Sequence, residues 1–126
     1  MNIEELQYRA YDHAHSKGFW NDYEEVTTDT WQSEPAIEAI KSAFIGQKLA
    51  LIHSEVSEAL EEVREGHYDA THKHGEKPEG LPSELADIVI RVADLCGALG
   101  VDLEATIIEK LDYNSRSRGH KHGKKF

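Results

Sequence analysis

The sequence of 126 residues predicts an all-α chain, organised as a four-helix bundle. Four segments carry apolar residues at every third or fourth position, which is the spacing of a helix with a buried face. No segment has the strong alternation of apolar and polar residues that predicts a strand. Serine, proline and glycine stand at the expected helix boundaries. We therefore expect a single helical domain over residues 1–126.

The first predicted helix covers about residues 3–17 and ends at Gly18, because glycine commonly follows the last turn of a helix. A loop follows that is rich in aromatic residues. The second helix begins near Ser33, a capping residue, and Pro35 is tolerated in its first turn. This helix continues to about Glu65 and ends before Gly66.

The segment 66–82 contains Gly, Pro and His without helical periodicity, so we expect a connection without regular structure. The third helix runs from about Ser83 to Leu99 and ends at Gly100. The fourth runs from a cap at Asp102 to about Tyr113. Residues 115–126 carry five Lys and Arg residues and no acid, and this basic tail either folds over a substrate or stays a free end.

The overall charge and hydropathy exclude two classes of partner. A net charge of −10 argues against nucleic acid, since phosphate backbones are met by Lys and Arg. No apolar run approaches the roughly 20 residues that span a membrane, and the N-terminus lacks the plan of a signal peptide. We expect a cytoplasmic protein without a membrane partner. Helices with two apolar faces in so small a domain also predict a homodimer or homotetramer.

Two acidic pairs hold the most informative pattern in the chain. Glu55 and Glu58 in the second helix, and Glu84 and Asp87 in the third, are each three residues apart and so share a helix face. At 100° per residue, Glu55 and Glu58 continue the apolar stripe of the second helix. The predicted solvent-facing side of that helix holds instead His53, Ser57, Glu61 and Arg64.

The third helix is apolar nearly all round, which predicts burial, and its narrow polar strip consists of Glu84, Asp87, Arg91 and Asp94. One interpretation is structural: Arg91 pairs with Asp87 or Asp94 on its own helix. That pairing does not account for the acids of the second helix. A hard cation does, because Mg²⁺ prefers oxygen ligands and Mn²⁺ can replace it. Zinc would favour Cys or His, and a di-iron bundle would need Glu-x-x-His.

With these motifs the sequence resembles the MazG-like all-α nucleoside triphosphate pyrophosphohydrolases. The resemblance extends from about Leu49 to the C-terminus and rests on IHSEVSEALEEVREG, ELADIVIRVADLCGALGVDLE and EKLDYN followed by HGKK. It implies that Glu55, Glu58, Glu84 and Asp87 bind Mg²⁺. Either Glu55 or Glu58 would act as the general base.

The resemblance also implies a set of substrate-binding residues. Lys110 and Asn114 would contact the phosphates, and the arginine that usually follows corresponds to Arg116 or Arg118. Arg91 is a further candidate for substrate binding. Trp20 stands where the family places an aromatic residue in the base pocket, although it could equally be a core or interface residue.

The expected activity is hydrolysis of a (d)NTP to (d)NMP and pyrophosphate, in sanitation or control of the nucleotide pool. Two alternatives remain open from the sequence. One is a non-catalytic helical bundle that binds a metal or a partner. The other is hydrolysis of phosphoribosyl-ATP.

Overall fold

A computed structural model describes residues 1–29, 31–69, 72–117 and 124. Within these ranges the chain is mostly helical, which confirms the predicted all-α class. The elements in chain order are α1 (Ile3–Ser16), α2 (Asn21–Thr27), α3 (Glu34–Arg64), β1 (His72–His74), β2 (Lys77–Glu79), α4 (Leu81–Leu99) and α5 (Leu103–Ser117). Within the described ranges, no helix is long and apolar enough to cross a membrane.

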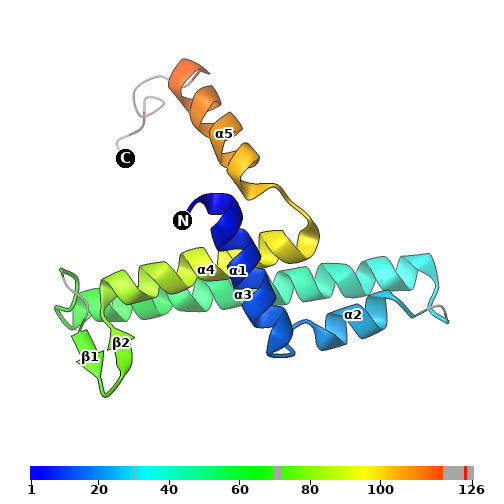
Figure 1. Ribbon diagram of the computed structural model, residues 1–126, viewed down its shortest axis with the longest axis horizontal. Helices are drawn as coiled ribbons and strands as arrows, with labels where there is room; N and C mark the ends of the chain where they lie inside the picture. Colours follow the sequence, from blue (N-terminus) through cyan, green and yellow to red (C-terminus); the bar gives the residue numbers. More distant parts are fainter. Residues whose placement is uncertain (30, 70–71, 118–123, 125–126) are drawn as a thin grey trace.

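Two long helices form the body of the molecule. Figure 1 shows α3 and α4 side by side and running in opposite directions, with α1 crossing over α4. The short helix α2 packs against the N-terminal half of α3, while α5 projects away and contacts α1. Gln7 holds the start of α5 through its side-chain amide, which donates to the carbonyl oxygen of Val101 and accepts from the amide of Leu103.

The boundaries of the long helices follow their capping residues. Ser33 caps α3 by accepting a hydrogen bond from the amide of Ala36. Gly100 ends α4 in the left-handed conformation, with φ at 68°, which glycine adopts without steric cost. The predicted boundaries of the first and second helices are therefore confirmed to within a residue or two, and α4 begins two residues earlier than predicted.

Two predicted connections contain regular structure instead. Part of the aromatic loop forms the helix α2. Trp20, just before this helix, and Tyr23, near its start, pack into the core cluster and thereby stabilise the helix. The segment 66–82 contains an antiparallel hairpin in which His74 pairs with Lys77. The turn between them begins with Gly75, whose φ is 64°. The prediction of irregular structure was wrong here, since charged strands this short carry little sequence signal.

The core lies where α1, α2, α3 and α4 meet. Trp20, Ala14 and Leu95 are its buried members. The helix α1 comes very close to α4 at Gly97, where an added Cβ atom would lie 2.6 Å from the Cβ atom of Tyr11. The glycine therefore permits a close crossing of the two helices, and this crossing fixes one wall of the site described next.

Candidate metal centre

Three carboxylates from two helices meet at the α3–α4 interface. Glu55 and Glu58 lie one turn apart on α3, and Glu84 lies in the first turn of α4. One oxygen of each lies within 4.8 Å of one oxygen of both others. Three of the four predicted ligands are thus brought together by the antiparallel packing of the two helices. The predicted solvent-facing acid, Glu61, is exposed and pairs with Arg64 at 3.0 Å, and it also lines a cavity together with Glu58 and Glu84.

Glu84 is the acid with the least polar support. Its residue is 8% exposed, and its Oε2 atom is buried without a hydrogen-bond partner. Burial raises the pKa of this carboxyl, and the negative charges of Glu58, Asp87 and Glu55 raise it further. A buried acceptor without a donor costs on the order of 1–3 kcal/mol. A bound cation would remove both the missing contact and the repulsion.

Asp87, the fourth predicted ligand, borders this cluster. It lies one turn after Glu84 on α4, and its side chain is exposed. It does not belong to the group of carboxylates within 4.8 Å of one another. Its charge nevertheless contributes to the raised pKa of Glu84, and together with Glu55 it lines a groove.

Arg91 does not pair within its own helix. Its Nε atom donates to Oε1 of Glu55 at 2.6 Å, so the ion pair joins α4 to α3. The alternative interpretation, in which Arg91 pairs with Asp87 or Asp94, is therefore not the arrangement that the structure has. The physical reason is burial: Glu55 is 8% exposed and gains more from a counter-ion than the exposed Asp87 does, while Asp94 accepts a hydrogen bond from Trp20.

The acids open onto two cavities. Glu58 and Glu84 line a cavity of about 470 Å³ beside the hairpin, which Lys77 also lines. Glu55 and Asp87 line a groove of about 470 Å³ on the other side, between α1, α3 and α4. Members of the carboxylate cluster therefore line both cavities.

The groove on the α1 side combines cations with apolar walls. Arg91 and Lys48 supply positive charge. The walls include Phe19, Leu51, Ile90 and Leu95. Sequence analysis missed Lys48, although its spacing carried the signal. It lies seven residues, or two turns, before Glu55 and hence on the same stripe of α3.

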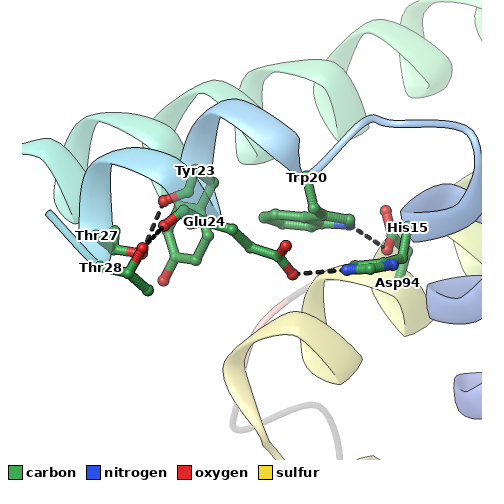
Figure 2. Close-up of polar contacts among 7 residues, drawn as sticks. All are labelled: His15, Trp20, Tyr23, Glu24, Thr27, Thr28 and Asp94. Carbon is green, nitrogen blue, oxygen red and sulfur yellow. Dashed lines mark hydrogen bonds and ion pairs between the residues drawn. The ribbon is translucent and has the colours of Figure 1, made fainter.

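An aromatic cluster lies next to Asp94, one of the residues that line this groove, and Figure 2 shows its polar contacts. Trp20 is 2% exposed, and its Nε1 atom donates to Oδ1 of Asp94 at 2.8 Å. The ring of Tyr23 meets the indole edge-on at 5.4 Å, and Nζ of Lys48 lies 4.5 Å from the indole centroid. His15 contacts Glu24 at 2.7 Å nearby. Of the two roles expected for Trp20, the structure supports the core role, because both faces of the indole are covered.

Asp94, on the same helix, is an acid with a hydrogen-bond donor and positive charges beside it. Burial raises its pKa, while the hydrogen bond from Trp20 and the positive charges of Lys48 and Arg91 act in the opposite direction. Its carboxylate is therefore a structural acceptor for the indole as well as part of the groove wall.

The predicted phosphate-binding residues on α5 do not lie at the carboxylates of the same chain. The helix projects away from α3 and α4 in Figure 1. On it, Nζ of Lys110 lies 5.2 Å from the ring centroid of Tyr113, and Arg116 pairs with Asp112. Asn114 is half-buried on the same helix. Arg118 lies outside the described residues.

The donor atoms of this arrangement restrict the kind of cation that it could bind. Its donors are carboxylate oxygens, which suit a hard divalent cation. No cysteine or histidine belongs to the group of Glu55, Glu58 and Glu84 among the described residues. No protein-family model, curated protein or solved structure matches this chain.

Proposed function

We propose that the chain is a Mg²⁺-dependent nucleoside triphosphate pyrophosphohydrolase of the MazG-like kind, acting on the nucleotide pool in the cytoplasm. One observation carries the proposal. The buried Oε2 atom of Glu84 has no partner and lies among carboxylates from a second helix. Such a group is stable only when a cation or a proton neutralises it. Mg²⁺ fits the oxygen donors and leaves room for phosphate ligands, and Mn²⁺ can replace it.

The same group of carboxylates would hold the cation and move a proton. Glu55, Glu58 and Glu84 would hold it, with Asp87 as the fourth ligand. Mg²⁺ supplies charge stabilisation for the phosphate and the departing pyrophosphate. Glu58 is the better candidate for the general base, because its side chain is exposed to solvent while Glu55 is bonded to Arg91. Glu58 would take the proton of the water that attacks the α-phosphorus. The bond between the α-phosphorus and the oxygen that bridges to the β-phosphate would break, and that oxygen would leave with the pyrophosphate.

A triphosphate also needs cations from the protein, since carboxylates alone would repel it. Arg91 and Lys48 lie in the groove that Glu55 lines. Its apolar walls would accept a nucleoside, while the α-phosphate lies toward the carboxylates. The groove thereby favours a nucleotide over a simple polyphosphate as substrate.

A second copy of the chain completes this proposal. Large apolar side chains on α3 and α4 are about half exposed, notably Leu49, Val56, Leu60, Leu85 and Val89. Exposure of this kind on two neighbouring helices favours a helical partner. We therefore propose a homodimer or homotetramer, in which α5 of a neighbouring copy brings Lys110, Asn114 and Arg116 to the phosphates.

The test is product analysis with purified protein, Mg²⁺ and a panel of NTPs, dNTPs and phosphoribosyl-ATP. We expect pyrophosphate and a monophosphate from at least one nucleoside triphosphate. Glu58→Gln should reduce kcat by about 10²–10⁴-fold, the usual contribution of a general base. Glu38→Gln, which removes an exposed acid near the start of the same helix, is the matched control and should keep the rate. Orthophosphate as first product would rule out cleavage between α and β, and Mg²⁺ binding without turnover would favour the non-catalytic bundle.

A further inference from the structure

The ion pair between Arg91 and Glu55 stands at the boundary between the carboxylate cluster and the groove. Glu55 belongs to the cluster and is almost fully buried. Arg91 is half exposed and lines the groove. Their 2.6 Å contact links α4 to α3 at this site. One cation therefore touches both the predicted metal site and the predicted substrate site.

The cluster contains more negative charge than this contact can offset. Glu55, Glu58 and Glu84 have oxygens within 4.8 Å of one another, and one oxygen of Glu84 has no partner. Among the described residues, Arg91 is the one cation that forms an ion pair with any of these three acids. The guanidinium stays protonated at any physiological pH, so it cannot release Glu55 by losing its charge. It can release Glu55 only by moving or by exchange with another cation.

We propose that Arg91 is an exchangeable counter-ion: it neutralises Glu55 in the metal-free protein, yields that carboxylate to Mg²⁺, and then binds a substrate phosphate in the groove beside Lys48. The proposal rests on the function proposed above. The position of the side chain makes the exchange short, since a planar guanidinium at the groove wall needs only to turn from one oxyanion to another.

Lys48 makes the groove suitable for the second half of the exchange. Its Nζ atom lies over the face of Trp20 and 3.4 Å from the carbonyl oxygen of Phe19. Among the described residues, no hydrogen bond or ion pair joins it to Glu55, Glu58 or Glu84. Lys48 thus adds positive charge to the groove without competing for the metal ligands, whereas Arg91 competes directly.

A different role for Arg91 predicts the opposite change in Mg²⁺ affinity when Arg91 is removed. If Arg91 only orients Glu55 for the metal, removing it should weaken metal binding by about 10–100-fold, as for other groups that support metal ligands. An exchangeable counter-ion opposes metal binding, because a cation close to the site repels Mg²⁺ and occupies one of its ligands. The direction of the change in Mg²⁺ affinity therefore separates the two roles.

The experiment is calorimetric titration of the full chain with Mg²⁺ alone, followed by a non-hydrolysable nucleoside triphosphate analogue in saturating Mg²⁺. For Arg91→Gln we expect Mg²⁺ to bind about tenfold more tightly and the analogue about tenfold more weakly than in the wild type. Arg64→Gln is the matched control. It breaks the exposed pair between Arg64 and Glu61 with the same change in charge, and both affinities should stay within about twofold.

Weaker or unchanged Mg²⁺ binding by Arg91→Gln would overturn the proposal, as would unchanged binding of the analogue. If this variant folds only with Mg²⁺, Arg91→Met replaces it, because methionine removes the charge and keeps an unbranched apolar side chain, and an Mg²⁺ affinity no higher than that of the wild type would be the contrary result. Failure of the proposed function has a different signature: a wild-type protein that binds no Mg²⁺, or that binds it and releases no pyrophosphate.

Discussion

The two ends of the α3–α4 interface surround an acid of α4 in opposite ways. At the aromatic end, the half-buried Asp94 accepts a hydrogen bond from Trp20 and has Lys48 and Arg91 near it. At the carboxylate end, Glu84 has a buried oxygen without a partner, and the charges that shift its pKa are those of other acids. Burial raises the pKa of both groups. Only the surroundings of Asp94 act against that effect, and they reduce it without cancelling it.

This contrast separates stability from function within one helix. The side chains at the aromatic end pack closely against one another, and we expect them to hold α1, α2 and α4 together. The carboxylate end contains the buried carboxylate of Glu84, whose negative charge destabilises the fold and is not needed for packing. Destabilising charges are typical of functional sites, where they become favourable once a ligand binds. Four substitutions and conditions test whether the two ends differ in this way.

Truncation of Trp20 is the largest expected effect. Trp20→Ala should lower the free energy of unfolding by about 3–5 kcal/mol, because it empties the core cluster and leaves Asp94 without its donor. Urea unfolding followed by circular dichroism measures the change. Trp31→Ala is the control, since Trp31 is 93% exposed, and it should change stability by less than about 0.5 kcal/mol. Similar losses in the two variants would contradict the assignment of the core.

Neutralisation of Glu84 should act in the opposite direction. We expect Glu84→Gln to raise the free energy of unfolding of the metal-free protein by roughly 1–3 kcal/mol, because it removes repulsion with Glu55 and Glu58. In the wild type, Mg²⁺ at about 100 times its Kd should add about 2.7 kcal/mol. The variant should lose most of that gain. A loss of stability in metal-free Glu84→Gln would show that the carboxylate end is not strained.

The pH dependence of stability sharpens the same comparison. A carboxyl whose pKa is raised on folding destabilises the native state above that pKa, and the penalty disappears as the pH falls toward the ordinary value of 4.5. The stability difference between metal-free wild type and Glu84→Gln should therefore shrink as the pH is lowered from 8 to 5. Urea titrations at several pH values measure it, and a difference that grows on acidification would be inconsistent with the raised pKa.

Substitution of Asp94 should have the smallest effect. Asn at this position keeps an oxygen that can accept the indole hydrogen bond, and the charge that it removes is partly offset by Lys48 and Arg91. We expect Asp94→Asn to change the free energy of unfolding by less than about 1 kcal/mol. A change as large as that for Glu84→Gln would mean that the two acids are equivalent.

Much of the framework could be predicted because it depends on local signals. Ser33 and Gly100 mark helix ends by capping chemistry, and helical phase separates Glu55 from Glu61. The helix α2 and the hairpin could not be predicted, because they depend on tertiary contacts and on a turn at Gly75. Local propensity is a weak guide to such short elements.

The carboxylate cluster was predictable from the sequence, but the cations beside it were not. Spacing of three residues places Glu55 and Glu58 on one face from sequence alone. The partner of Arg91 was not predictable, because it lies on another helix and the choice among Glu55, Asp87 and Asp94 depends on relative burial. The position of α5 was likewise beyond local rules, since few contacts anchor it.

The start of α4 has an electrostatic consequence of its own. Glu84 is the fourth residue of α4, so the aligned peptide dipoles of the helix place roughly half a positive charge beside its carboxylate. That partial charge favours the ionised form by about 0.3–1 kcal/mol, and it is present with or without a cation. Because the hairpin sets where α4 begins, a change in the length of that connection should tune cation affinity without altering any ligand.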